Sequence, residues 1–186
     1  MTASAKKWII VVAAMGLLVL LSSELAKAAN VVAPNLGVGT QRKSFLGQAD
    51  MPRGIRNNNP GNLKMTTPQQ GWLGSIDRGE NTDGVFEQFV FYGYGLRAML
   101  KLMRNKMTRN GDNSIRKLIY SWAPPGENST ENYIAAVENV TGIPQNQVID
   151  VNDKDRLFAI AQAIESQENG KVVMTRRDFD NAYNLI

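Results

Sequence analysis

An amide-rich segment is the part of this sequence best equipped to grip a ligand. The segment Arg53–Lys64 reads RGIRNNNPGNLK. Asn, Pro and Gly each favour turns, so this composition predicts a loop. Its side chains offer paired donors and acceptors that suit an uncharged ligand rich in hydroxyls and amides, such as a sugar chain. The alternative is a loop whose amides bond only their own backbone. The candidate binding residues are Asn57, Asn58, Asn59, Gly61 and Asn62.

Glu168 is the first candidate for acid–base chemistry. It follows Ile164 by four residues and Ala161 by seven, on the apolar face and in the last turn of a predicted helix. Partial desolvation and the negative end of the helix dipole would both help a carboxyl there to keep a proton. A general acid for glycosidic bond cleavage needs this property. The alternative is a frayed helix end that leaves Glu168 in water. We predict that Glu165, about a right angle away, is a surface charge.

Two more glutamates and two tryptophans are weaker candidates. Glu127 lies in the turn 122–128, WAPPGEN, where it would bind substrate or, alternatively, bond the start of the next helix. Glu87 lies on a predicted hairpin, either at the lip of a cleft or partly buried. Trp72 and Trp122 would stack on sugar rings or, alternatively, belong to the core.

The composition excludes several kinds of enzyme. The chain of 186 residues has no Cys and no His, which rules out structural disulfides, Cys nucleophiles, Ser-His-Asp triads and His-ligated zinc. Carboxylates alone are the usual equipment for cleaving glycosidic bonds. We expect no metal and no cofactor. The net charge of +4 suits anionic partners. No basic stripe alternates with aromatic residues, so we do not expect nucleic-acid binding.

The sequence divides into three parts. Residues 1–29 carry two lysines and then an apolar run from Trp8 to Leu21, followed by the small-residue pattern AKA at 26–28. This pattern is typical of a secretory signal or of an uncleaved membrane anchor. We expect an anchor that contacts a membrane through residues 8–29, with the rest of the chain facing outward. Residues 30–52 are predicted to be a flexible linker, and residues 53–186 a folded domain.

The predicted domain is mainly α-helical with one small β-hairpin. Residues 72–74 and 85–91 have the composition of short strands, separated by a turn-rich segment. From Gly95 onward the apolar spacing becomes helical. Caps and breakers divide the remainder into five helices, which begin near Gly95, Ile115, Thr130, Asp153 and Thr175. The fold class is therefore α+β, with an additional N-terminal apolar helix.

Several motifs together resemble a family of phage and prophage virion proteins. They are RGIRNNNPGN at 53–62, WLG at 72–74, FEQF at 86–89, YGLRA at 94–98, WAPPGEN at 122–128 and ENG at 168–170. They occur in this order in that family, and the similarity extends over residues 53–171. The resemblance implies a location in the virion, with other virion proteins as possible partners.

The NPGN loop, the hairpin and the GLRA helix also resemble the sugar-binding half of lysozyme-like murein hydrolases. In that group a helix ending in the catalytic Glu precedes this half, whereas here the similar helix ends in Glu168 and follows it. The resemblance therefore implies a circularly permuted lysozyme-like domain. It implies a membrane-associated protein that cleaves peptidoglycan glycan strands as a lytic transglycosylase or muramidase, with its domain facing the periplasm or cell wall. The alternative is a non-catalytic virion protein that links a membrane to a capsid vertex. It is suggested by Gln167, which stands where the resemblance would place a His.

Overall fold

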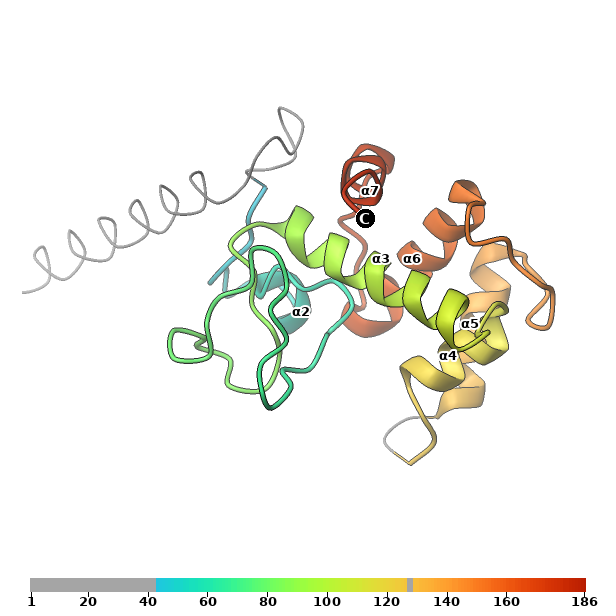
Figure 1. Cartoon of the computed structure of the whole chain (residues 1–186), viewed down its shortest axis with the longest axis horizontal. Helices are drawn as coiled ribbons and strands as arrows, with labels where there is room; N and C mark the ends of the chain where they lie inside the picture. The colour runs from blue at the N-terminus through green and yellow to red at the C-terminus, as the bar shows by residue number, and fades with distance from the viewer. Residues whose placement is uncertain (1–42, 127–128) are drawn as a thin grey trace, which may run out of the picture. The chain divides into compact units, whose positions relative to one another are not determined.

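The computed structural model describes residues 43–126 and 129–186, and Figure 1 shows a domain built mainly of helices. The predicted anchor, the linker up to residue 42 and Glu127 lie outside these residues. Within the described ranges, none of the helices combines the length and apolar character needed to cross a bilayer. The helices are α2 (Arg53–Arg56), α3 (Tyr92–Arg109), α4 (Ile115–Trp122), α5 (Thr130–Thr141), α6 (Lys154–Asn169) and α7 (Arg176–Tyr183).

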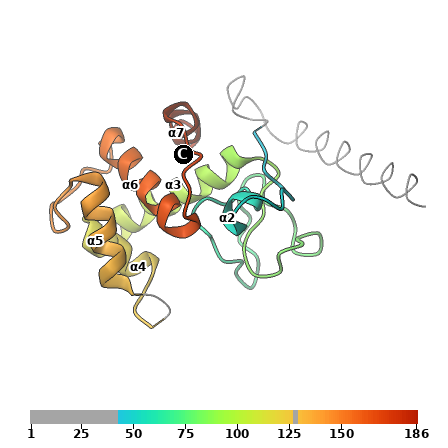
Figure 2. The same cartoon turned by 180° about the vertical axis from the view of Figure 1, so that it is seen from behind.

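Helix α3 is the element around which the domain is arranged. Its predicted apolar stripe is confirmed, because Leu96, Met99 and Met103 are almost fully buried. Helices α4 and α7 both pack against α3, and α5 packs against α4 and α6. The irregular segment 57–91, here called the loop region, lies toward one end of α3, and α4 and α5 lie toward the other (Figures 1 and 2).

Helix α6 begins and ends at residues that the sequence marks clearly. At its start, the side chain of Asp153 accepts a hydrogen bond from the backbone N–H of Arg156. At its end, Gly170 adopts a left-handed conformation with a φ of 64°, which glycine takes without steric strain. Its N–H donates to the carbonyl of Ser166 over 2.7 Å. These caps place Glu168 in the last turn of the helix, as predicted.

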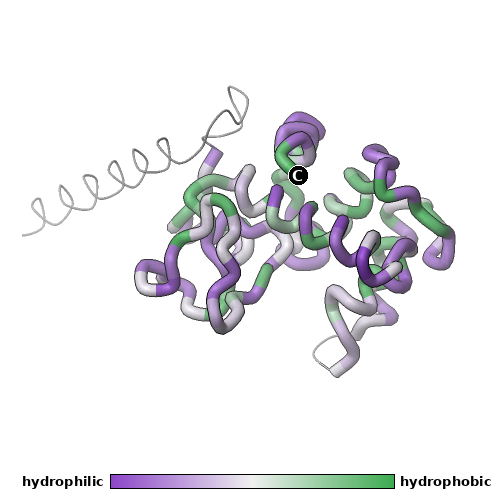
Figure 3. The backbone as a smooth tube through the Cα atoms, in the orientation of Figure 1, coloured by the Kyte–Doolittle hydropathy of each residue, from purple (hydrophilic) through white to green (hydrophobic). Residues whose placement is uncertain are grey.

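The predicted β-hairpin is wrong as a pair of strands. Within residues 57–91, strand-like pairing is limited to two isolated antiparallel bridges, Lys64 with Phe86 and Ser75 with Phe89. Polar side chains form hydrogen bonds with backbone groups that would otherwise pair two strands. For example, Asp83 Oδ1 accepts from the backbone N–H of Phe86. The loop region is mostly hydrophilic or neutral along its length (Figure 3), so it offers little apolar surface to stabilise a sheet.

The folded part includes residues that the sequence assigned to the linker. Lys43 Nζ donates to the carboxylate of Asp178 over 2.8 Å and to the carbonyl of Val173 over 2.6 Å. The ring of Phe45 packs edge-on against Tyr92. The predicted domain boundary at residue 53 is therefore too late. The Lys43 hydrogen bond to Val173 joins residues 130 positions apart, which local composition does not reveal.

Candidate functional site

Glu168 is held by hydrogen bonds from three separate segments. Its Oε2 accepts from Asn62 Nδ2 over 3.0 Å. Its Oε1 accepts from the hydroxyl of Tyr133 over 3.1 Å and from Trp122 Nε1 over 3.3 Å. These donors belong to the loop region, to α5 and to the end of α4. The carboxylate therefore has a fixed orientation at the place where these segments meet.

Two surface grooves meet at Glu168. The larger, here called the tryptophan groove, has a volume of about 530 Å³, which is in the usual range for ligand sites. It is lined by residues 61–64, 86, 102, 106, 121–124 and 168. The smaller, here called the amide groove, has a volume of about 400 Å³ and is lined by Ser129, Asn132, Tyr133, Gln167 and Glu168. A ligand that bound along both grooves would pass over the Glu168 carboxylate.

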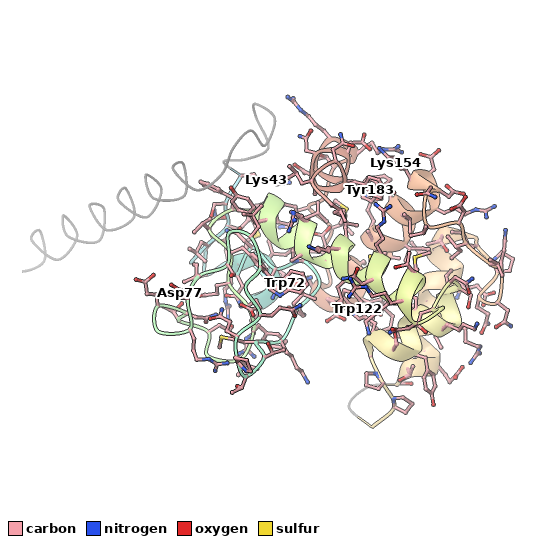
Figure 4. The ribbon with its side chains drawn as sticks, in the orientation of Figure 1. Lys43, Trp72, Asp77, Trp122, Lys154 and Tyr183 are labelled. Carbon is pink, nitrogen blue, oxygen red and sulfur yellow. The ribbon has the colours of Figure 1, made fainter. Side chains whose placement is uncertain are left out.

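Gly61 allows the loop region to approach Trp122 closely. A Cβ added to Gly61 would lie 2.9 Å from a ring carbon of Trp122, closer than real Cβ contacts allow. Glycine at this position therefore lets the indole reach Glu168. Figure 4 places Trp122 at the end of α4, and this half-buried side chain lines the tryptophan groove.

Asn62 shows two signs of strain. Its φ is +48°, which is uncommon for a residue other than glycine. Its Nδ2 donates both to the carboxylate and to the backbone carbonyl of Glu168, each over 3.0 Å. Its Oδ1 is buried, with no donor among the residues that the structure describes. Strained backbone and unpaired buried polar atoms occur preferentially at functional sites.

The other three asparagines of the loop lie away from both grooves. Each is at most 2% exposed, and each bonds atoms of the protein. Asn57 Nδ2 donates to Asp83, Asn58 Nδ2 to the carbonyl of Phe89, and Asn59 Nδ2 to the carbonyls of Leu63 and Glu87. Of the five candidate binding residues in the amide-rich segment, the structure thus places only Gly61 and Asn62 at the groove, and the other three hold the loop together.

Glu87 and Trp72 also lie away from the grooves. Glu87 is fully buried, and its Oε2 accepts from Gln69 over 2.9 Å. Burial raises the pKa of Glu87, against the opposing effects of Gln69 and the positive charge of Arg78. Trp72 is half-buried within the loop region (Figure 4) and is not among the groove-lining residues.

The prediction that Glu165 is a surface charge is wrong, because its side chain is fully buried. The hydroxyl of Tyr92 donates to its Oε1 over 2.6 Å, and the N–H of Met174 to its Oε2 over 3.1 Å. Burial raises the pKa of Glu165, although these bonds and the charge of Lys43 act against the rise. The signal was present in the sequence: Glu165 follows Ala161 by four residues and so shares its buried face.

Tyr133 lies at the site but is not among the candidate site residues predicted from the sequence. Its ring is buried on the inward face of α5, and its hydroxyl reaches Glu168. Burial, the charge of Glu168 and the hydrogen bond to it raise the pKa of Tyr133 well above its usual range, so this phenol stays a donor. The helical spacing gives the direction of the ring but not the partner of its hydroxyl.

Comparison with known proteins finds one relevant relative. No family model matches the chain. Over 119 residues the chain is 40% identical to Protein P5 of Pseudoalteromonas phage PM2. The match covers 63% of this chain and 71% of that protein.

Proposed function

Because this chain belongs to the family of phage proteins that includes Protein P5 of Pseudoalteromonas phage PM2, we propose that it is a virion protein that cleaves the glycan strands of peptidoglycan. The observation that carries the proposal is the position of Glu168, a carboxylate held by three donors at the junction of two grooves. Because of the resemblance to lysozyme-like murein hydrolases, we interpret Glu168 as the general acid. The domain would then act on the cell wall during entry or exit.

In the proposed reaction, a glycan strand lies along both grooves with its glycosidic oxygen beside Glu168. The carboxyl of Glu168 protonates that oxygen as the bond to the sugar carbon breaks. Asn62, Tyr133 and Trp122 keep the carboxyl in place while this happens. The indole of Trp122 also offers an apolar face to a sugar ring in the tryptophan groove.

The lining of the grooves favours a lytic transglycosylase over a two-carboxylate hydrolase. Among the described residues that line the two grooves, Glu168 is the only carboxylic acid. Hydrolases usually pair the general acid with a second carboxylate about 5 to 10 Å away. A transglycosylase needs no such partner, because the same carboxylate next removes a proton from a hydroxyl of the sugar, which closes the ring internally.

Digestion of purified murein sacculi by the full chain tests this proposal. We expect soluble muropeptides with internally closed sugar ends, identified by mass spectrometry. Glu168→Gln should release them about 10²- to 10⁴-fold more slowly, the usual contribution of an acid–base group. Glu131→Gln, an exposed carboxylate on α5, is the matched control and should keep full activity. Equal release by Glu168→Gln and the unmodified chain would remove Glu168 from this role.

A second candidate function is that of a non-catalytic virion protein. It is favoured by the hydrogen bonding of Glu168, because both carboxylate oxygens already accept bonds from protein donors that join four segments of the domain. In this case Glu168 would stabilise the fold. Binding to sacculi or capsid protein without release of muropeptides, together with unfolding of Glu168→Gln at lower urea concentration, would support it.

We also propose membrane association through residues 8–29, which lie outside the described residues. Flotation of the full chain with lipid vesicles tests this, with a chain lacking residues 1–29 as the control. Equal flotation of the two chains would count against an N-terminal anchor.

A further inference from the structure

Helix α3 carries five basic residues and no acidic one. Three of them, Arg97, Lys101 and Arg104, are four and three positions apart and so form a single stripe along the helix. All three are partly exposed, and within the described residues none of them pairs with a carboxylate. Like charges at this spacing repel each other, so an anion beside the stripe would stabilise it.

A fourth cation, Lys154 at the start of α6, extends this stripe. The ring of Tyr183 lies between the two helices, with its centroid 5.8 Å from the guanidinium carbon of Arg104 and 4.7 Å from Lys154 Nζ. The hydroxyl of Tyr183 donates to the carbonyl of Val151 over 3.3 Å, which holds the ring in place. The name basic face is used below for Arg97, Lys101, Arg104 and Lys154.

The carboxylates at the start of α6 and on α7 do not cancel this charge. Asp153 pairs with Arg156, and both Asp155 and Asp180 pair with Arg176. These three acids share two arginines, which leaves one negative charge against the four positive charges of the basic face. The surface therefore keeps a net positive charge.

The basic face and the tryptophan groove lie on opposite sides of α3. Lys106 lines the groove and follows Arg104 by two residues, so the two side chains point about 160° apart around the helix axis. Figure 4 shows the same division, with Tyr183 on one side of α3 and Trp122 on the other. A ligand in the groove therefore leaves the basic face open to a second partner.

The described chain begins on the side of the basic face. Figure 4 places Lys43 on the same side of α3 as Tyr183. Lys43 pairs with Asp178 of α7, and α7 packs against α3. Residues 30–42 separate this point from the proposed membrane segment 8–29, and fully extended they would span at most about 45 Å. A membrane that held this segment would thus be within reach of the basic face.

We infer that the basic face binds the anionic head groups of a lipid membrane, while the grooves face away from that membrane. The choice of a membrane as the partner rests on the proposed function, in which residues 8–29 are an anchor. Ammonium and guanidinium groups donate to phosphate oxygens. Each basic residue close to an anionic membrane typically contributes about fivefold in affinity. The contact orients the domain so that Glu168 faces the glycan and not the lipid.

Acetylation of lysines in the full-length chain, followed by mass spectrometry, tests this contact. One sample contains vesicles of phosphatidylcholine, and the other contains vesicles with equal parts of phosphatidylcholine and phosphatidylglycerol. We expect acetylation of Lys101 and Lys154 to be at least about fivefold slower with the anionic vesicles. The rates should recover in about 1 M salt, where charges are screened over about 3 Å. Lys117, an exposed lysine of α4, is the control and should react equally fast in both samples.

Substitutions then assign the protection to the basic face. In the double variant Lys101→Gln/Arg104→Gln, Lys154 should react as fast with anionic vesicles as with neutral ones. Arg104→Lys keeps the charge and should keep the protection of Lys154. Arg109→Gln/Lys117→Gln removes the same amount of charge outside the basic face and is the matched control. Circular dichroism checks that each variant is folded.

Equal acetylation rates of Lys101 and Lys154 with the two kinds of vesicle would overturn the inference. Equal slowing of Lys117 would also overturn it, because the whole surface would then adsorb without preference. Slowing by double-stranded DNA and not by anionic vesicles would assign the basic face to a nucleic acid instead.

The same samples separate this inference from the proposed function. Flotation with both kinds of vesicle but no slowing of Lys101 and Lys154 would leave the N-terminal anchor standing and remove the inference. Slowing with anionic vesicles but no flotation with neutral ones would support the basic face and count against the anchor. Release of muropeptides from sacculi is measured separately and depends on neither result.

Discussion

Glu165 and Glu168 stand three residues apart on α6, in two unlike regions of the molecule. Around Glu165 the partners are Tyr92 and the backbone of Met174, all enclosed by the core. Around Glu168 the partners are groups at the edges of two open grooves. The same side chain on the same helix is therefore enclosed by the core in one region and lies at the edge of open grooves in the other. A turn of the helix, rather than residue type, decides between burial in the core and a position at the grooves.

The amide loop shows the same division. Asn57, Asn58 and Asn59 come before Pro60 and Gly61, and their side chains bond the loop region itself. Asn62 comes after them and bonds Glu168. The four amides have the composition of one binding motif, but three of their side chains stabilise the loop region and only the fourth, from Asn62, lies at a groove. The predictions that follow test this division between a core side and a groove side.

The largest effect on stability should come from Glu165. Glu165→Ala leaves the buried Tyr92 hydroxyl and the N–H of Met174 without their partner, which should lower the free energy of unfolding by about 3 kcal/mol. Glu168→Ala should lower it by less than about 1 kcal/mol, because its donors lie at a groove where water can replace it. Urea denaturation measures both. Equal losses would show that Glu168 also belongs to the structural core, as the non-catalytic alternative requires.

The contrast between the two regions also shows how much of the fold could be predicted from the sequence. Periodicity and caps predicted the helices from Gly95 onward, because each helix has its own local signals. They also placed Glu168 in a last turn. They failed for the hairpin, where Asp83 and its neighbours compete for backbone N–H groups. They failed too for Lys43, whose carboxylate partner lies far along the chain.

The candidate site was predictable only in part for a similar reason. The sequence suggested that Asn62, Gly61 and Trp122 accompany Glu168, because the residue types suit a sugar ligand. The structure brings them together at one groove. The hydroxyl of Tyr133 was missed, since helical spacing gives the face of a side chain and not the group that it meets across a groove. Partners of that kind depend on how whole elements pack.

Asn59 and Asn62 should separate stability from activity. Asn59 makes bonds through both ends of its amide, including one to its Oδ1 from the N–H of Leu63 over 2.9 Å. Asn59→Ala should therefore lower the free energy of unfolding by about 2 kcal/mol. Asn62→Gly keeps the positive φ and removes a buried unpaired oxygen, so stability should change by less than about 0.5 kcal/mol.

Activity should follow the opposite order. Asn62→Gly removes the amide that holds Glu168, so release of muropeptides should fall about tenfold, as expected from the loss of a hydrogen bond to a charged group. Folded Asn59→Ala, assayed well below its melting temperature, should stay within about twofold of the unmodified chain. An Asn62→Gly variant with full activity would mean that the amide serves the fold and not the chemistry.

The smallest effect should be a dependence of stability on pH, with opposite signs at two carboxylates. Burial raises the pKa of Glu165 above its ordinary 4.5. The folded state then binds the proton more tightly than the unfolded state. The stabilisation is full below about pH 4.5 and is lost as the pH rises through the raised pKa.

Burial would also raise the pKa of Asp83, but hydrogen bonds from Arg53, Asn57 and two backbone amides outweigh it and hold this pKa well below its ordinary 3.8. Its stabilisation is therefore present above about pH 3.8 and is lost as the pH falls.

Unfolding of Glu165→Gln and Asp83→Asn between about pH 3 and pH 8 would measure both dependences. The stability difference between the unmodified chain and Glu165→Gln should shrink with rising pH. The difference from Asp83→Asn should instead shrink with falling pH. A pH-independent difference at Glu165 would mean that its pKa is the same in the folded and unfolded states despite full burial. Lys43 and Tyr92 would then offset the cost of burying the charge of Glu165.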